Sequence, residues 1–337
     1  MKVALIGLGM VSRTFGDAIR NSDAVELSYV YARSAESRAR FLADWPDLGA
    51  VEATSVAEIA ASDVDFVLLT TPPNARVGIV EELVAAGKPI LMEKPVERTL
   101  EGAIKLVETC EAANVPLGIM LQHRARPVVD DLRKLLPELG ALRMAEVNVP
   151  WWRPQAYYDE PGRGSYARDG GGVMISQAIH TMDLMLSLTG PVSEVTAMTA
   201  TSDFHDMESE DFVCAGMRFE NGAVGQLFAT TSSFPGKGET ITLHFAAGSV
   251  HLEAGLLEIN WQDGRSETVG QAASSGAGAD PMAFTSDWHR FVIEDFAEAV
   301  THSRAPLVPG RVALEVHRLI TALEASGKSG TTVQVKR

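Results

Sequence analysis

The stretch Val3-Ala4-Leu5-Ile6-Gly7-Leu8-Gly9-Met10-Val11-Ser12 decides how the N-terminal part of this chain folds. Four apolar residues in a row predict a strand that is buried on both faces. Two glycines follow, and apolar residues then recur at helical spacing up to residue 19. A strand that enters a helix through glycines is the context of a dinucleotide-binding turn. We therefore expect such a turn after the first strand.

The glycines of this turn have separate expected roles. Gly7 allows the tight turn, and Gly9 lets a pyrophosphate approach the backbone, while free N–H groups at the helix start face the phosphates. Ser12 stands where the usual fingerprint has a third glycine. The residues that we expect to contact the dinucleotide here are Gly7, Leu8, Gly9, Met10 and Val11.

The second predicted strand, residues 25–32, bears on the choice between NAD and NADP. Sites for the unphosphorylated cofactor usually place an acidic residue at the end of this strand. Here the strand ends in Ala32-Arg33-Ser34, and Arg38 follows one turn into the next helix. A hydroxyl and guanidinium groups suit a 2′-phosphate, so we expect Arg33, Ser34 and Arg38 to favour NADP. The alternative is that both arginines are solvated residues at a helix start.

Further strands are predicted over residues 65–70, 90–92 and 117–121, with helices over 77–86 and 100–113. Strands and helices that alternate over about 120 residues predict a doubly wound parallel sheet. We assign residues 1–122 to this dinucleotide-binding domain.

The stretch Lys88-Pro89-Ile90-Leu91-Met92-Glu93-Lys94-Pro95 is a short buried strand that ends in a charged pair and a proline. Ligands bind at the carboxyl ends of strands in open parallel sheets, so Glu93 and Lys94 are expected where a cofactor and a reacting group meet. A solvated Glu–Lys pair is the simpler alternative. The expected cofactor contacts at neighbouring strand ends are Thr71, Pro72, Asn74 and Gln122.

From residue 123 the pattern changes. Residues 153–169 lack periodicity and are rich in Tyr, Arg and Gly, which suits either a plain surface loop or the cover of a polyhydroxylated or anionic ligand. Three glycines, 170–172, then open a predicted helix over residues 173–188. Ser176, His180 and Asp183 would share one face of that helix. A lone helical histidine is more often packed or solvated than catalytic.

Alternating residues from 192 onward predict a large open, mainly antiparallel sheet, with Asn221-Gly222 at a hairpin turn. Residues 123–337 would form an α+β domain for substrate binding and oligomerisation. We expect a homodimer or homotetramer through this sheet, because it carries more large apolar residues than one buried face needs. The residues behind this expectation are Phe219, Leu227, Phe228, Phe234 and Phe245.

Composition restricts the partners. The chain of 337 residues has a formal net charge of −15, which argues against nucleic acid as a partner. No apolar run approaches the ~20 residues of a membrane span. Cys110 and Cys214 are the only cysteines, so a cytoplasmic, reducing compartment is expected. The eight histidines are scattered without ligand spacing, so we expect no metal site.

Taken in order, these motifs resemble the glucose–fructose oxidoreductase / inositol dehydrogenase / MocA family of nicotinamide-dependent oxidoreductases. The resemblance spans essentially the whole chain. The motifs that carry it are Gly7-Leu8-Gly9, Thr71-Pro72-Pro73, Ala86-Gly87-Lys88, Glu93-Lys94-Pro95, and Gly170-Gly171-Gly172 followed by His180 and Asp183.

The resemblance implies an N-terminal Rossmann domain, a ribose-binding Glu93, a cis bond before Pro95, and Lys94 and His180 as catalytic residues. It implies hydride transfer between the nicotinamide and a secondary alcohol or ketone of a sugar, sugar acid, cyclitol or nucleotide sugar. The alternatives are a cofactor-recycling glycoside hydrolase or lyase and a non-enzymatic dinucleotide sensor. The expected substrate contacts are Lys94, Arg153, Tyr157, Arg168, Ser176, Gln177 and His180.

The chain departs from the family pattern at two positions. Ser176 stands where the family often has an Asp or Asn four residues before the histidine, and a hydroxyl cannot act as the charged partner of His180. Arg76 stands where many members carry His. Either Gln177 contributes a substrate hydrogen bond, or the proton route relies on Lys94 and His180 alone.

Overall fold

The computed structural model describes residues 1–273, 276–280 and 282–336. The chain divides into two compact units, one made of Met1–Gln122 and Ser286–Leu314, the other of His123–Thr285 and Glu315–Arg337. One division between the units falls after residue 122, and residues 286–314 group with the first unit, whereas the predicted domains were 1–122 and 123–337.

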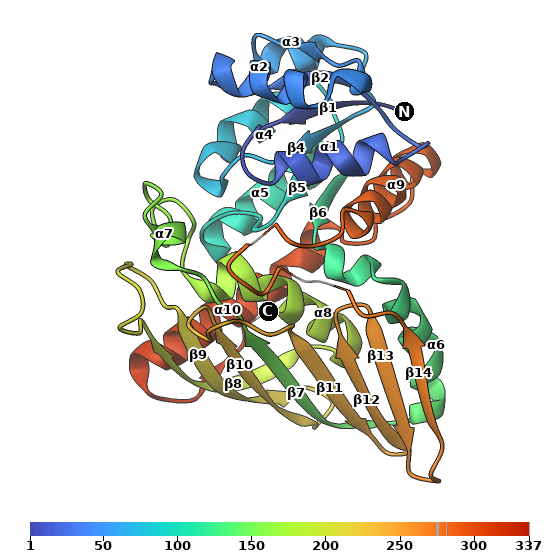
Figure 1. Cartoon of the computed structure of the whole chain (residues 1–337), viewed down its shortest axis with the longest axis vertical. Coiled ribbons are helices and arrows are strands. Elements are labelled where there is room, and N and C mark those ends of the chain that lie inside the picture. Colours follow the sequence, from blue (N-terminus) through green and yellow to red (C-terminus); the bar gives the residue numbers. More distant parts are fainter. Residues whose placement is uncertain (274–275, 281, 337) are drawn as a thin grey trace. The chain divides into compact units, whose positions relative to one another are not determined.

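The first unit holds a six-stranded parallel sheet in the order β3-β2-β1-β4-β5-β6 (Figure 1). Strands β1, β4, β5 and β6 are almost wholly buried, as their continuous apolar runs predicted, whereas the edge strand β3 is exposed. The strands are β1 (Lys2–Ile6), β2 (Glu26–Tyr31), β3 (Val51–Glu52), β4 (Phe66–Leu69), β5 (Ile90–Glu93) and β6 (Leu117–Met120). The helices are α1 (Ser12–Arg20), α2 (Ala35–Asp44), α3 (Val56–Ala61), α4 (Arg76–Ala85), α5 (Leu100–Ala112) and α9 (Asp287–His302), with short 3-10 turns η1 (Pro46–Leu48) and η2 (Pro73–Ala75).

Helix α9 belongs to this unit because its apolar face packs on the parallel sheet. The Phe296 ring meets the Phe66 ring of β4 edge to face at 5.2 Å. The carbonyl oxygen of Val308 accepts a hydrogen bond from the N–H of Ile119 in β6 at 2.9 Å. Such tertiary packing leaves no local signal in the sequence, and the predicted domain 123–337 therefore included α9.

The second unit holds a nine-stranded sheet in the order β14-β13-β12-β11-β7-β10-β9-β8-β15. All pairs are antiparallel except β7 with β10. The strands are β7 (Leu142–Pro150), β8 (Val192–Ala200), β9 (Phe212–Phe219), β10 (Val224–Thr230), β11 (Thr240–Phe245), β12 (Gly248–Glu253), β13 (Leu256–Trp261), β14 (Ser266–Gly270) and β15 (Val333–Gln334). The predicted fold class, a doubly wound parallel sheet followed by an α+β part with a mainly antiparallel sheet, is confirmed.

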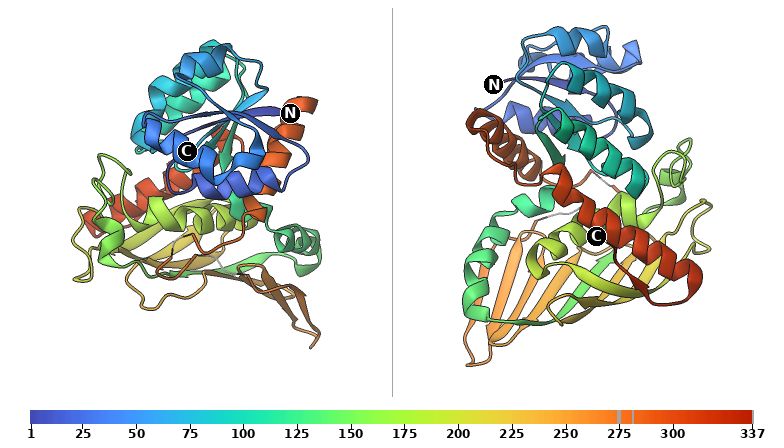
Figure 2. Two further views of the ribbon diagram at one scale, coloured as in Figure 1. Left: turned by 45° about the horizontal axis from the view of Figure 1, so that its top comes forward. Right: turned by 180° about the vertical axis from the view of Figure 1, so that it is seen from behind.

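Helices accompany this sheet, and Figure 2 shows α6 running along its β13–β14 end. The helical segments are the 3-10 turn η3 (Gln122–Ala125), α6 (Pro127–Leu139), α7 (Gln155–Tyr158), the π-helical turn η4 (Met174–Ala178), α8 (Ile179–Thr189) and α10 (Gly310–Ser329). η3 begins at Gln122, the last residue of the first segment of the first unit, and α10 begins in the first unit and continues into the second.

The π-helical turn η4 is a departure from the predicted regular helix 173–188. Gly172 explains how it begins: a Cβ there would lie 1.7 Å from the carbonyl oxygen of Glu210. The Glu210 carboxylate then accepts hydrogen bonds from the N–H groups of Gly172 and Met174, at 3.2 and 3.1 Å. A π-turn holds more residues than an α-turn, so the face that we predicted for Ser176 with His180 does not extend across it.

Candidate functional site

The turn after β1 has the geometry of a dinucleotide-binding turn. Gly7 has φ +105°, and a Cβ on it would lie 2.7 Å from the backbone nitrogen of Thr71. The Thr70 hydroxyl donates to the Gly7 carbonyl oxygen at 2.5 Å. Only glycine fits this contact between the ends of β1 and β4, because the position is both left-handed and crowded.

Gly9 lies in the opposite kind of surroundings. A Cβ on Gly9 would have no heavy atom of the described chain within 4 Å. Helix α1 starts after Val11 with no side chain capping it, so its first N–H groups suit an anion. Ser12, in the place of the third glycine, donates its hydroxyl to the Gly9 carbonyl oxygen at 2.7 Å. Ser12 therefore ties the turn together.

The three residues after β2 that we predicted to bind a 2′-phosphate have different surroundings. Arg38 donates to the Glu52 carboxylate at 2.7 Å and to the Ala32 carbonyl oxygen at 2.5 Å. Ser34 caps α2 by accepting from the Ser37 N–H at 3.2 Å. Arg33 is exposed. Arg38 is thus largely committed to the fold, which leaves Arg33 as the guanidinium best placed for a ligand.

Two buried polar atoms at the carboxyl ends of β4 and β6 support a ligand at this edge. Thr71 Oγ1 and Gln122 Oε1 find no hydrogen-bond partner among the residues that the structure describes. Buried polar groups are nearly always paired, so such atoms need an explanation. Together with the space at Gly9 and the helix start, they fit a nicotinamide dinucleotide. Pro72 and Asn74, also predicted contacts, are exposed in the same loop.

Glu93 ends β5 and is buried, with 6% of its surface exposed. It accepts a hydrogen bond from the Lys94 N–H at 3.1 Å, and His289 Nε2 lies 3.8 Å from Glu93 Oε1. Burial raises the pKa of Glu93, while the charges of Lys94 and Arg76 oppose that rise. Burial, with the nearby Lys94 charge, lowers the pKa of His289 to about 3. His289 is therefore a neutral neighbour of Glu93, and no sequence pattern placed it there.

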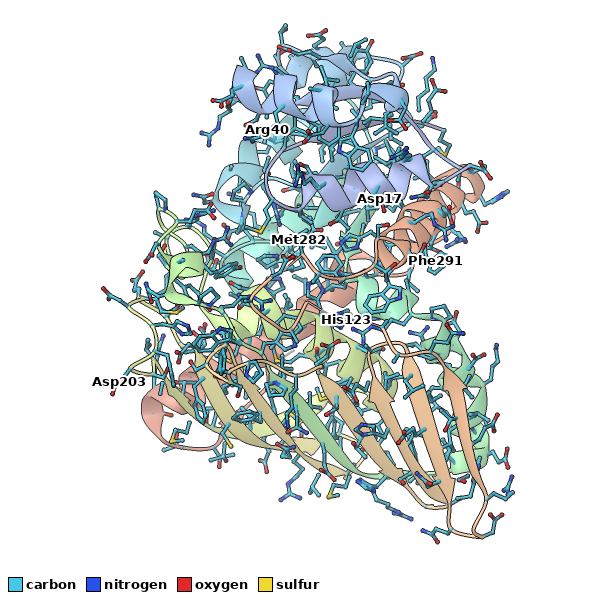
Figure 3. All side chains as sticks on the ribbon, in the orientation of Figure 1. Asp17, Arg40, His123, Asp203, Met282 and Phe291 are labelled. Atoms are coloured by element: carbon cyan, nitrogen blue, oxygen red, sulfur yellow. The ribbon has the colours of Figure 1, made fainter. Side chains whose placement is uncertain are left out.

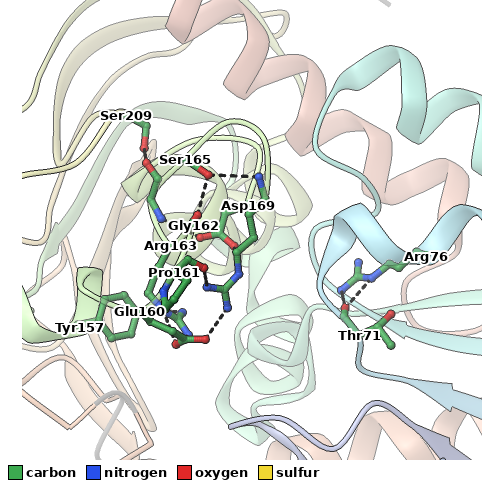
Figure 4. A network of polar contacts seen from close by, with 12 residues as sticks. Thr71, Arg76, Tyr157, Glu160, Pro161, Gly162, Arg163, Ser165, Asp169 and Ser209 are labelled. Carbon is green, nitrogen blue, oxygen red and sulfur yellow. Dashed lines mark hydrogen bonds and ion pairs between the residues drawn. The ribbon is translucent and has the colours of Figure 1, made fainter. Parts of the chain in front are cut away.

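The Lys94–Pro95 peptide bond is cis, as the family resemblance implied. Arg76, noted above as a departure from the family pattern, is buried and donates to the carbonyl oxygens of Glu93 and Pro95, on either side of Lys94. Figure 4 shows the Arg76 guanidinium with two bonds to the Thr71 carbonyl oxygen.

In the second unit, His180 is the second residue of α8 and is buried. Its ring lies 5.1 Å, centroid to centroid, from the ring of His123, which is labelled in Figure 3. His123 Nε2 lies 3.9 Å from Glu239 Oε1. Glu239 also accepts from Arg126 at 2.5 Å and from the Trp151 ring N–H at 3.2 Å. A buried carboxylate thus lies behind the two histidines, although Ser176 supplies none.

Asp183 holds α8 to η3. Arg124 donates to both Asp183 carboxylate oxygens at 2.6 Å. Burial raises the pKa of Asp183, and the Arg124 charge opposes that rise. A buried pair of this kind is costly to break on one side only, so we assign Asp183 an anchoring role.

The predicted substrate loop is built around Tyr157 and Glu160 (Figure 4). The Tyr157 hydroxyl accepts from Arg163 at 3.0 Å and from Gln177 at 3.4 Å. Glu160 pairs with Arg163 and, at 2.6 Å, with Arg168. The structure therefore brings the predicted substrate residues Tyr157 and Gln177 together, with Arg168 joined to them through the Glu160 pair.

Arg153 has different surroundings from the other predicted substrate residues. It is buried and donates to the carbonyl oxygens of Gly278 and Gly276 at 2.6 and 2.8 Å. These bonds favour a structural role, and its predicted role in binding substrate stays a prediction. Ser176 is half-buried in η4, one residue before Gln177.

Two groups that the sequence analysis missed support this loop and the helix beside it. Burial raises the pKa of Glu210, the carboxyl that caps η4, to about 7. His205 meets the Asp211 carboxylate at 2.7 Å through Nδ1 and the Arg153 carbonyl oxygen at 2.8 Å through Nε2. Both partners are acceptors, so the ring donates from both nitrogens and is charged. Hydrogen bonds from His205 and neighbouring serines lower the pKa of Asp211 to about 2.

Over the described ranges, no cluster of three or more His, Cys, Asp or Glu side chains has the arrangement of a metal site. None of the helices in the described part of the chain is both long and apolar enough to span a membrane.

Comparison with known proteins agrees with this geometry. Residues 1–121 match the oxidoreductase family with an NAD-binding Rossmann fold, and residues 131–251 match the GFO/IDH/MocA C-terminal domain. The D-apiose dehydrogenase of Paraburkholderia graminis is 25% identical, over 99% of this chain and 90% of its own length. The myo-inositol dehydrogenase Hyg17 of Streptomyces leeuwenhoekii is 29% identical, over 86% of this chain and 84% of its own.

Among solved structures, the WlbA dehydrogenase of Bordetella pertussis in complex with NADH and UDP-GlcNAcA is similar throughout. It is 26% identical, with a TM-score of 0.84 over 100% of this chain and 98% of that one. Both halves of the sequence and the whole fold point the same way, and the chain belongs to the GFO/IDH/MocA family of NAD-binding oxidoreductases.

Proposed function

We propose that this oxidoreductase transfers a hydride between a nicotinamide dinucleotide and a secondary alcohol or ketone of a sugar, sugar acid, cyclitol or nucleotide sugar. The observation that carries the proposal is the carboxyl edge of the parallel sheet. There the open turn at Gly9, the unpartnered oxygens of Thr71 and Gln122, and the Glu93–Lys94 pair occur on adjacent strands. Two relatives are named as dehydrogenases of D-apiose and of myo-inositol, and these names support a sugar or cyclitol as the substrate.

The proposed roles follow from the chemistry of each side chain. When bound, the dinucleotide supplies the hydride acceptor or donor. Glu93 would accept hydrogen bonds from ribose hydroxyls, and Lys94 would polarise the reacting oxygen or take its proton. His180 would hydrogen-bond the substrate hydroxyl. A positive charge that develops on His180 would be stabilised through His123 by the Glu239 carboxylate, whose Oε1 lies 3.9 Å from His123 Nε2.

The test is a panel of D-apiose, myo-inositol and UDP-sugar acids, each with NAD⁺ and with NADP⁺, followed by the absorbance of the reduced nicotinamide. We expect reduced cofactor and ketone in equal amounts. Product without net cofactor reduction would mean a cofactor-recycling lyase or hydrolase, and dinucleotide binding with no product would mean a sensor.

We further propose that NADP is preferred, through Arg33. No acidic side chain follows β2 directly, and Ser34 keeps its hydroxyl hydrogen available to donate while its oxygen caps α2. A charge-assisted contact of about 1.5–3 kcal/mol corresponds to a preference of roughly ten- to hundredfold. Titrating both cofactors by intrinsic fluorescence tests this proposal.

We also propose a cytoplasmic homodimer or homotetramer that forms through the nine-stranded sheet, with Phe228 as predicted and with Met198 and Cys214 beside it. Phe219, Leu227 and Phe245 lie in the core, so they do not enlarge an exposed surface. On the opposite face, Met198 pairs in register with Cys214, and Cys214 pairs with Phe228. Met198 is 61% exposed. An apolar row across three strands is typical of an interface.

A further inference from the structure

The buried guanidinium of Arg76 has no assigned role in the proposed reaction. Arg76 begins α4 and is 1% exposed, so its charge is removed from water. Burying an unpaired cation is expensive, and such groups persist only where hydrogen bonds compensate them. The hydrogen-bond partners of the Arg76 guanidinium therefore indicate its role.

Within the described part of the chain, the hydrogen bonds of this guanidinium all go to main-chain carbonyls of two strand-end turns. Nε and Nη2 donate to the Thr71 carbonyl oxygen after β4, at 2.9 and 2.8 Å. Nη1 donates to the carbonyl oxygen of Glu93 at 2.6 Å and to that of Pro95, and Nη2 lies 3.5 Å from that of Lys94. Arg76 thus joins the turn after β4 to the turn after β5 (the Thr71 side is drawn in Figure 4).

This geometry needs arginine and not merely a positive charge. The planar guanidinium presents five donors in a fixed fork, whereas an ammonium is a compact point charge on a flexible stem. Burial lowers the pKa of Arg76 to about 10, so the group stays charged at neutral pH. The carboxylates of Glu93 and Glu97 oppose that lowering.

The turn after β4 also contacts the glycine turn that we expect to bind the dinucleotide. The Thr71 nitrogen is the atom that a Cβ on Gly7 would strike, so the Gly7 turn and the Thr71 turn are in close contact. The contacts therefore run from Gly7 through Thr71 and Arg76 to the backbone of Glu93 and Lys94. On the other side, His289 lies 3.8 Å from the Glu93 carboxylate.

We propose that Arg76 is a positioning residue that sets the backbone of Glu93 and Lys94 relative to the bound dinucleotide. The inference rests on the proposed function, since it takes Lys94 as the residue that acts on the reacting oxygen. A displacement of about 1 Å at a reacting group can cost on the order of 10² in rate. Loss of Arg76 should therefore slow the chemical step more than it weakens binding.

The variants are Arg76→Met, Arg76→Lys and Lys94→Ala, with Arg304→Met as a matched control. Arg304 lies in the same unit and bonds Asp295 and Glu298, away from the strand-end turns. Arg76→Lys keeps a charge and a donor if Arg76→Met folds poorly. The measurements are kcat, KM, the Kd of NADP⁺ and the primary deuterium isotope effect, using the fastest alcohol of the panel.

We expect Arg76→Met to lower kcat by about 10²-fold while the Kd of NADP⁺ changes by less than about fivefold. The isotope effect should rise, because a misplaced Lys94 makes hydride transfer more rate-limiting, and Arg76→Lys should recover part of kcat. A purely structural role would lower the active fraction and leave the isotope effect unchanged. Arg76→Met with wild-type kcat, beside an inactive Lys94→Ala, would overturn the inference alone.

Normal turnover in Lys94→Ala would instead refute the proposed function. Hydrogen exchange with NADP⁺ as the probe tests the positioning without any substrate. We expect NADP⁺ to protect residues 90–98 in the wild type and in Arg304→Met but not in Arg76→Met. Equal protection in all three proteins would contradict the inference whether or not a panel alcohol is oxidised.

Discussion

Replacing Lys94 with Ala tests the residue on which the proposed reaction depends. If its ammonium or amine shares the proton of the reacting hydroxyl, Lys94→Ala should lower kcat by about 10²–10⁴-fold. That range corresponds to about 3–5 kcal/mol of lost transition-state stabilisation. The effect on dinucleotide binding should be far smaller, for reasons that the structure supplies.

The contacts expected to hold the cofactor survive the substitution. Lys94 donates to the Glu93 carboxylate through its backbone N–H, at 3.1 Å, and alanine keeps that donor. What the variant loses is a charge that lowers the pKa of both Glu93 and His289. The pKa of Glu93 should rise further, so its carboxylate ionises at a higher pH. We therefore expect the Kd of the dinucleotide to rise by only a few-fold at pH 8, and more at pH 6.

The assay combines kcat–pH profiles with cofactor titrations at both pH values. Lys88→Ala is the matched control, because Lys88 precedes the same strand and donates to the carbonyl oxygens of Ser62 and Val64 at 2.6 and 3.0 Å. It should lower the melting temperature and leave kcat unchanged. The double variant Lys94→Ala/His180→Ala should be little slower than the slower single variant if both residues serve the same proton transfer. Near-normal turnover in Lys94→Ala would refute the reasoning.

Three further outcomes are expected. Arg33→Ala should reduce the preference for NADP⁺ about tenfold in a fluorescence titration, whereas Arg38→Ala should mainly lower the melting temperature; the opposite pattern would contradict the assignment. Met198→Arg should shift the light-scattering mass towards the monomer, and an unchanged mass would exclude this sheet face. Asp211→Asn should cost about 2 kcal/mol in urea unfolding between pH 4 and pH 6, since Asp211 has a pKa of about 2 against a usual 3.8. The stabilisation from Asp211 is lost as the pH falls towards 2. The share from His205, whose pKa is raised above 6.5, is lost as the pH rises through that raised value. An equal loss of unfolding free energy in Asp211→Asn at all pH values would contradict the pairing.

The sequence by itself determined the parallel sheet, its glycine turn and the position of Glu93 and Lys94. Those features depend on residues close together in the chain: an apolar run, a turn that only glycine permits, and a proline that ends a strand. The antiparallel sheet and the hairpin at Asn221-Gly222 could be predicted from the sequence for the same reason. Gly222 has φ +87°, as the turn requires. Local periodicity and turn chemistry are enough to predict strands, helices and turns, which depend on residues close together in the chain.

Only the tertiary structure decided which polar groups those elements bring together. Glu210 lies 38 residues after Gly172 and accepts a hydrogen bond from the Gly172 N–H. This contact occurs at the π-turn, which changes the helix face that we predicted. His289 reaches Glu93 only because α9 packs back on the first sheet. Residue type predicts that an arginine or histidine will find partners, but not which ones. Partners distant in sequence are chosen by the packing of whole elements, and no period or spacing in the chain records that choice.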